Sequence, residues 1–122
     1  MAVEETLTAL FNPLVANRVY WDSTPEGGVD VPDGGIIILQ QVGGDADWYL
    51  EGAMPSHKNA RIQVVCYAKR RVAAGALARL VEKTLCESTL IAQPFGAFQS
   101  SFEPDLKIYE TLQQFGVWYP DP

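Results

Sequence analysis

The chain contains one histidine, His57, and a cysteine, Cys66, nine residues farther along in the segment SHKNARIQVVCYAKRR. A cysteine nucleophile needs a thiolate with a base within hydrogen-bond reach. Apolar and polar residues alternate here, which places Cys66 on the apolar side with Val64, where burial raises the pKa of a thiol. Along an extended strand, His57 would lie roughly 30 Å away. We therefore predict that Cys66 is a core residue and that there are no catalytic residues. Cys86, at the end of a later helix, is also predicted to serve packing.

The remaining polar motifs do not predict a metal or cofactor site. One histidine and two distant cysteines lack the ligand spacing of zinc sites. The DAD sequence, Asp45 to Asp47, lacks the ligand series of a calcium loop and is interpreted as an acidic turn. The glycine-rich sequence PEGGVDVPDGG contains neither G-x-G-x-x-G nor the lysine of a P-loop. We predict no cofactor and no metal.

The composition bounds the class of protein. With 122 residues, 48% of them hydrophobic and 20% charged, the chain is expected to form one globular domain spanning residues 1–122. A net charge of −6 argues against specific nucleic-acid binding, which depends on Lys and Arg. The acidic N-terminal segment is unlike a signal peptide, and the sequence contains no apolar run long enough to span a membrane. Two cysteines form no disulfide framework and are expected to be reduced in the cytoplasm.

The elements that must position these residues follow from hydrophobic periodicity. Helical spacing predicts a first helix from residue 3 that Pro13 ends, and a second over 72–87. The stripe expected to face the core on the second helix is Ala73, Ala76, Leu77, Leu80, Val81, Thr84 and Leu85. Strands are predicted over residues 17–22, 36–42 and 60–69, followed by two final strands over residues 95–105 and 107–120. Residues 48–52 are an optional further strand. The expected fold class is α+β, with two helices packed on one face of a mainly antiparallel, mixed β-sheet.

Charge is divided along the chain. Residues 19–57 contain seven acids and no Lys or Arg, whereas residues 58–83 contain seven bases and one acid. The two blocks either face each other within the fold or are solvated, or they lie on different faces and meet across a subunit interface. The candidate interface residues are Arg61, Tyr67, Lys69, Arg70 and Arg71 on the basic side and Asp45, Asp47 and Glu51 on the acidic side.

The glycine- and proline-rich residues 23–35 predict a loop that is long for a compact domain. We interpret it as a mobile assembly loop, with the candidate residues Glu26, Gly27, Gly28, Asp30, Asp33, Gly34 and Gly35. Three adjacent aromatic pairs are also present: Tyr20–Trp21, Trp48–Tyr49 and Trp118–Tyr119. On a strand, one member of each pair faces the core and the other faces outward, where aromatic residues favour protein contacts.

The order of these features resembles the short tail-completion proteins (tail terminators and head–tail joining proteins) of long-tailed phages and prophages. The residues that carry the resemblance are LFNPLVANRVYWD, IIILQQVGGDADWYLEG, HKNARIQVVCYAKRRVAAGALARLVEKTL and YETLQQFGVWY. The resemblance covers nearly the whole chain, and its most specific part is ARIQVVCYAK running directly into an Ala/Leu helix. Family members often have Thr or Ser and an acid at the start of that helix, where this chain has KRR. This departure concerns the helix cap and not the helix itself.

The resemblance implies a structural virion protein without enzymatic activity. Such a protein would form a ring, a hexamer, at the head-proximal end of the tail tube, where it stops tube growth and joins the tail to the head. Its expected partners are copies of itself, the tail tube protein and the head connector protein, with no membrane and no specific nucleic acid. Its expected locations are the virion tail and, during assembly, the host cytoplasm. The alternative from another class is a small cytoplasmic enzyme or ligand-binding domain with an acidic pocket near Asp45, Asp47 or His57.

Overall fold

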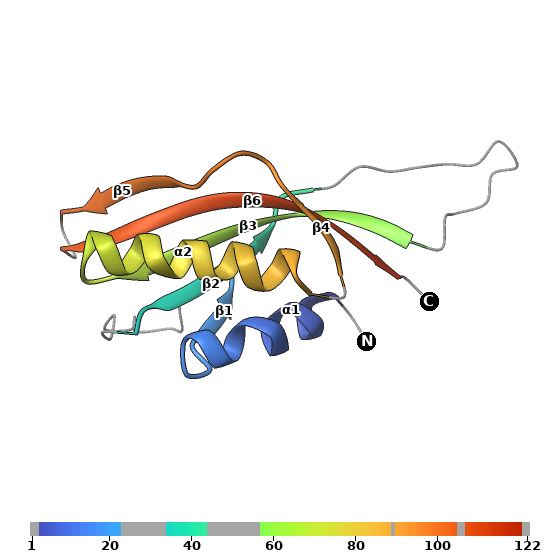
Figure 1. Cartoon of the computed structure of the whole chain (residues 1–122), viewed down its shortest axis with the longest axis horizontal. Helices are drawn as coiled ribbons and strands as arrows, with labels where there is room; N and C mark the ends of the chain where they lie inside the picture. The colour runs from blue at the N-terminus through green and yellow to red at the C-terminus, as the bar shows by residue number, and fades with distance from the viewer. Residues whose placement is uncertain (1–2, 23–33, 44–56, 89, 105–106, 121–122) are drawn as a thin grey trace, which may run out of the picture.

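The computed structural model of the protein describes residues 3–22, 34–43, 57–88, 90–104 and 107–120. Its elements are α1 (Val3–Phe11), the 3-10 helix η1 (Asn12–Leu14), β1 (Val19–Trp21), β2 (Ile36–Gln41), β3 (His57–Ala68), α2 (Arg71–Cys86), β4 (Ile91–Pro94), β5 (Gln99–Glu103) and β6 (Ile108–Pro120). Figure 1 shows α2 running along the two longest strands, β3 and β6, which lie side by side.

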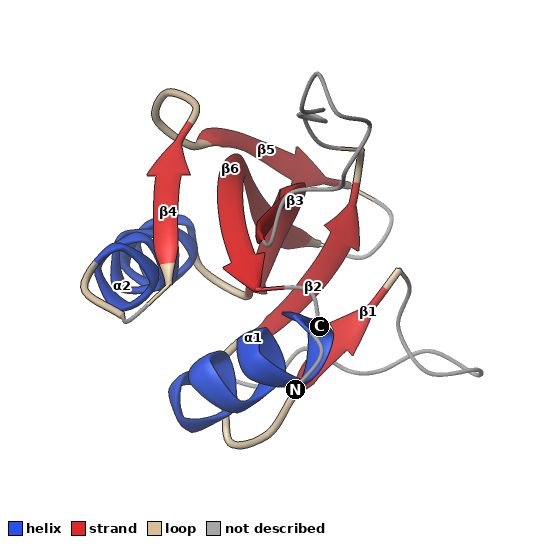
Figure 2. Ribbon diagram, turned by 90° about the vertical axis from the view of Figure 1, so that its right-hand side faces the viewer, coloured by secondary structure: helices blue, strands red, loops and turns tan. Residues whose placement is uncertain are grey.

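The described strands form one mixed sheet in the order β1-β2-β3-β6-β4, with β5 also paired to β6. β1 and β2 are parallel, and every other pair is antiparallel. β6 is long enough to pair with β3 along its full length on one side. On its other side it pairs with β5 near its start and with β4 near its end. Both helices lie on one side of this sheet (Figure 2), so the predicted α+β architecture is confirmed.

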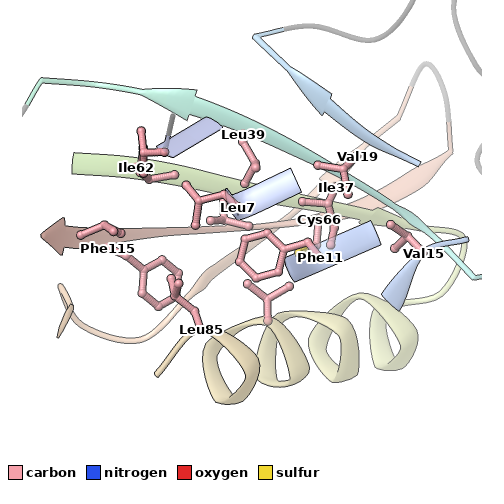
Figure 3. Close-up of a cluster of buried hydrophobic side chains, with 14 of the residues drawn as sticks. Leu7, Phe11, Val15, Val19, Ile37, Leu39, Ile62, Cys66, Leu85 and Phe115 are labelled. Atoms are coloured by element: carbon pink, nitrogen blue, oxygen red, sulfur yellow. The ribbon is translucent and has the colours of Figure 1, made fainter. Parts of the chain in front are cut away.

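Alternation along β3 decides which side chains face the helices. Ile62, Val64, Cys66 and Ala68 are all buried, as their two-residue period predicts. In the antiparallel register, Ile62 lies opposite Phe115 of β6, and Cys66 lies opposite Thr111. Figure 3 shows Ile62, Cys66 and Phe115 of the strands together with side chains of both helices, among them Leu7, Phe11 and Leu85. Burying each large apolar side chain contributes about 1.5–3 kcal/mol, so this layer is the main source of stability.

α1 forms where predicted. Glu4 and Glu5 lie in its first turn, where the helix dipole favours acids. Val3, Leu7 and Phe11 are buried on one stripe, and Pro13 lies in the 3-10 turn that follows the helix. These three side chains belong to the same core cluster as the β3 side chains, which places α1 against the sheet.

α2 is rotated relative to the predicted stripe. Ala76 and Leu80, both expected in the core, are exposed. The buried residues are instead Ala74, Gly75, Leu77, Ala78, Val81 and Leu85. Small residues occur on several sides of this helix, so the sequence allowed two overlapping stripes, and packing against the sheet selected one. The helix begins after Arg70 with no side-chain cap, in agreement with the missing cap residue in the sequence.

Strand boundaries differ from the predictions in two places. β3 begins at His57, three residues before the start of the strand predicted over residues 60–69. The predicted strand over residues 95–105 is shorter, because β5 begins only at Gln99, and a separate strand, β4, precedes it. Both differences arise from pairing with β6, which is long enough to extend β3 and to hold two short strands on its other side. The optional strand over 48–52 lies outside the described residues.

The second face of the sheet has no helix of the described chain against it. Val65 and Leu112, which are half-buried, lie on it, beside the buried Ile36 and Ile38. Gln40, Gln63 and Gln114 form the next row across three strands. We refer to this side as the open face.

Candidate functional site

A cleft of about 300 Å³ opens between the N-terminal half of α2 and the β5–β6 hairpin. Its lining combines two arginines, hydroxyl groups, aromatic rings and one carboxylate. The lining residues are Arg71, Val72, Ala74, Gly75, Arg79, Phe98, Ser100, Ser101, Phe102, Tyr109, Glu110 and Thr111. Its volume is at the lower end of the range of ligand pockets and is sufficient for one or two large side chains.

The strands contribute the floor and one wall of the cleft. In the β5–β6 register, Ser100 lies opposite Thr111, and Phe102 lies opposite Tyr109. The Phe102 and Tyr109 rings pack in a tilted arrangement with centroids 4.8 Å apart, yet Phe102 remains 47% exposed. Because large aromatic side chains gain much from burial, an exposed Phe beside a cleft favours contact with a partner.

The helix contributes the charged wall. The Arg79 guanidinium carbon lies 5.7 Å from the centre of the Phe98 ring, a cation–π arrangement that holds the side chain over the cleft. Gly75, one turn before Arg79, keeps the wall free of a side chain. A Cβ there would lie 3.5 Å from the Arg79 guanidinium and 3.7 Å from the Phe98 ring. Val72 beside them is 80% exposed, so the mouth of the cleft is both apolar and positively charged.

Glu110 forms hydrogen bonds with side chains on both neighbouring strands. The Ser101 hydroxyl donates to Glu110 Oε1 at 2.6 Å. Tyr67, directly opposite Glu110 on β3, also forms a hydrogen bond with it. Burial, the Glu110 charge, that hydrogen bond and the Glu103 charge raise the pKa of Tyr67, so its hydroxyl keeps its proton and donates. Glu110 neighbours Thr111 on β6, so its side chain points to the opposite face of the sheet, away from the helix side of the cleft where the two arginines lie.

A second arginine–aromatic contact lies on the open face. The Arg61 guanidinium carbon is 4.4 Å from the centre of the Phe95 ring, and Phe95 is 42% exposed. Arg61 shares this face with Gln63. The Phe95 amide donates to the Gln114 carbonyl, which places this contact at the side of β6.

The structure places the predicted interface residues in two separate regions. Lys69, Arg70 and Arg71 are exposed where β3 passes into α2, and Arg71 also lines the cleft. Arg61 lies on β3, eight residues before Lys69, which directly follows the strand. The two residues are roughly 26 Å apart, so the four bases do not form a single edge. Tyr67 is half-buried on the open face. The predicted acidic partners Asp45, Asp47 and Glu51 lie outside the described residues.

Only the end of the predicted assembly loop is described. Gly35 is buried with φ +80°, and its carbonyl accepts a hydrogen bond from Arg18 Nε at 3.1 Å. Gly34 is exposed next to it. This end of the loop is thus anchored where β2 begins. The other candidates, Glu26, Gly27, Gly28, Asp30 and Asp33, lie outside the described residues.

His57 and Cys66 do not form a catalytic pair. They lie nine residues apart on one strand, β3, which separates them by roughly 30 Å. Burial raises the pKa of the Cys66 thiol to about 12, with a lesser opposing effect of the Thr111 hydroxyl, so the thiol is protonated at neutral pH.

Cys86 is exposed, contrary to the prediction that it serves packing. Partial burial and the charges of Glu82 and Glu87 raise its pKa.

In the described part of the chain, His, Cys, Asp and Glu side chains nowhere gather in a group of three or more that would hold a metal ion. The helices described there are too short or too polar to cross a membrane.

No pattern in the sequence predicted the cleft. Its charged and aromatic walls come from Arg79 on α2 and from Phe98 and Phe102 on a different part of the chain, which only the fold brings together. One signal was present, namely a glycine inside an otherwise Ala/Leu-rich helix. Such a glycine lowers helix stability by about 1 kcal/mol relative to Ala and often has a packing or functional reason.

No protein-family model matches the chain, and no curated protein sequence matches it.

Proposed function

We propose that this protein is a structural subunit of a long-tailed phage or prophage virion. Copies of the chain assemble into a ring, a hexamer, at the head-proximal end of the tail tube. The ring terminates tail growth and joins the tail to the head through contacts with the tail tube protein and the head connector protein. The protein acts in the virion tail, after assembly in the host cytoplasm.

The observation that best supports an assembling subunit is its two separate arginine–aromatic surfaces. One is the cleft with Arg79 and Phe102, and the other is the Arg61–Phe95 contact on the open face. Arg and aromatic residues are enriched where proteins meet, and they contribute most of the binding energy there. A ring requires that one patch of a subunit meet a different patch of the next. A subunit with two distinct contact surfaces fits that requirement.

The deciding experiment is electron microscopy of particles produced without this protein. Tails that are overlong or lack heads are expected, because nothing would stop tube growth or connect the tube to the head. Virions of normal length and attachment would contradict the proposal. The intact gene supplied from a plasmid should restore normal particles, and this serves as the control.

Native mass spectrometry tests self-assembly directly. A ring is expected at high protein concentration and low salt, because charged contacts weaken as salt screens them. A protein that remains monomeric over a wide range of concentration and salt would contradict ring formation by the chain alone.

The alternative is a small enzyme or ligand-binding domain with an acidic pocket near Asp45, Asp47 or His57. The two aspartates lie outside the described residues. The cleft that is described is instead lined by two arginines, hydroxyl groups and aromatic rings, with Glu110 as its carboxylate. No specific observation favours this alternative over the assembly function.

A further inference from the structure

We propose that the cleft between α2 and the β5–β6 hairpin receives the acidic aromatic segment 45–51 of a second copy of this chain. This inference rests on the proposed function for the identity of the partner. It goes beyond that function by naming the receiving site and the segment that enters it.

The chemistry of the cleft selects an occupant that is apolar and negatively charged. Arg71 and Arg79 are exposed at its mouth, while Glu110 is bound to Ser101 and Tyr67. Val72 and Phe102 provide exposed apolar surface next to the two guanidinium groups. A cleft of about 300 Å³ accommodates one or two large side chains. The occupant should therefore present an aromatic or aliphatic side chain flanked by carboxylates.

The chain carries a segment of this kind. Residues 45–51 read DADWYLE, with Trp48, Tyr49 and Leu50 between Asp45 and Asp47 on one side and Glu51 on the other. The exposed acids of α1, Glu4 and Glu5, are not adjacent to an aromatic residue in the sequence. Charge complementarity and apolar content together favour residues 45–51.

Chain length favours a second molecule as the source of the occupant. The Gly43 carbonyl accepts a hydrogen bond from the Arg61 amide, which fixes the point where residues 44–56 leave β2. Thr111 lies in the cleft, on β6, and pairs with Cys66 of β3. Cys66 is five residues beyond Arg61 along β3, and β6 lies on the side of β3 away from Gly43. Strand geometry puts this point roughly 20 Å from Gly43. The five residues from Gly43 to Trp48 span at most about 17 Å, so in the same molecule the backbone of Trp48 stops short of Thr111 even when fully extended.

The start of β3, which follows residues 44–56 in the chain, and the start of α2, which borders the cleft, lie at opposite ends of the subunit. In Figure 1, β3 begins at one end of the molecule, and α2 begins at the other. A contact between two different ends is heterologous, so it repeats from subunit to subunit and closes into a ring when the rotation allows. The same contact would produce filaments if the rotation did not close.

A peptide-binding measurement tests the inference. A fluorescent synthetic peptide of residues 44–52, GDADWYLEG, is titrated with the full-length protein, and its anisotropy is recorded. Saturable binding is expected. Arg79→Glu should weaken it at least tenfold, because the substitution reverses a charge at the mouth of the cleft. Phe102→Ser should also weaken it.

The controls separate this site from general charge attraction. Lys83→Glu makes the same charge change on α2 at an exposed position outside the cleft lining, and it should leave the affinity within twofold. A peptide with Asn at positions 45 and 47 should bind more weakly. Absence of saturable binding, equal binding by Arg79→Glu and Lys83→Glu, or equal binding of a scrambled peptide would each overturn the inference.

These outcomes are distinct from those that test the proposed function. If the peptide does not bind in the cleft while particles lacking the protein have overlong tails, the inference fails and the function stands. If the peptide binds in the cleft while such particles are normal, the contact between copies stands and the phage function fails.

Discussion

The indole nitrogen of Trp21 donates a hydrogen bond to the hydroxyl oxygen of Thr8 at 2.9 Å, which joins β1 to α1. The Thr8 hydroxyl in turn donates to the Glu4 carbonyl of its own helix. Trp21 also packs against the main core, while Tyr20 faces the opposite side of the sheet. This pair therefore behaves as the alternation of a strand predicts, with one ring inward and one outward.

Thr8→Val is expected to destabilise the fold by about 1–2 kcal/mol, because the half-buried indole N–H loses its acceptor. Thr8→Ser is the matched control, since it keeps the hydroxyl and removes only a methyl group. The free energy of unfolding from urea titration measures both. If Thr8→Val unfolds at the same urea concentration as Thr8→Ser, the hydrogen bond does not contribute to stability.

Gly35→Ala is expected to lower the free energy of unfolding by about 2–4 kcal/mol, because two destabilising effects add. Its φ of +80° is unfavourable for Ala, and a Cβ would lie 2.7 Å from the Tyr67 carbonyl oxygen. Gly43→Ala is the matched control, with φ +103° but no atom within 4 Å of the added Cβ. It should cost only the backbone strain, about 1–2 kcal/mol. If urea unfolding shows that both variants lose the same free energy of unfolding, the close approach of the added Cβ to Tyr67 does not destabilise the fold.

The two thiols are expected to react at different rates with an aromatic disulfide reagent at pH 8. Cys86 is exposed and should react in the folded protein. Cys66 is buried and has a pKa of about 12, against 9.0 for an ordinary thiol, so its thiolate fraction is roughly a thousandfold lower. Cys86→Ser should therefore show no reactive thiol until denaturant is added. Rapid reaction of the folded Cys86→Ser variant would contradict the buried placement of Cys66.

The stability contributed by Cys66 is expected to depend on pH. The folded pKa is raised from 9.0 to about 12, so the unfolded chain loses this proton first as pH rises. The contribution is complete below pH 9 and declines from pH 9 to about pH 12, by about 1.4 kcal/mol per pH unit. Cys66→Ala removes the titrating group, so the stability difference between it and the native protein should shrink by about 2 kcal/mol from pH 7 to pH 10.5. A difference that stays constant over this range would contradict the raised pKa.

Reversing both charges in Arg70→Glu/Arg71→Glu is expected to weaken subunit assembly at least tenfold. Both residues are exposed at the start of α2, so the free energy of unfolding should change by no more than about 0.5 kcal/mol. Lys83→Glu and Lys107→Glu, also exposed, serve as charge-matched controls. Association is measured by native mass spectrometry and by the yield of mature tails. Unchanged association and tail maturation would contradict a role for these two arginines at the interface.

The sequence by itself determined the α+β class, the alternation that buries Cys66 and the positions of both helices. These features depend on local periodicity, because a two-residue period is compatible with a strand and a 3.6-residue period with a helix. The absence of a Cys–His pair also followed from local geometry, since nine residues of one strand separate the two side chains.

The tertiary structure decided the features that depend on contacts between residues far apart in the sequence. β4 is a strand only because it pairs with the end of β6, and α2 turned Leu80 outward because the sheet selected one of two overlapping stripes. Arg61 was separated from the other three predicted interface bases because β3 is long, which no count of charges reveals. The cleft joins Arg79 with Phe98 and Phe102, and their proximity results from the β5–β6 hairpin pairing beside α2 rather than from any spacing along the chain.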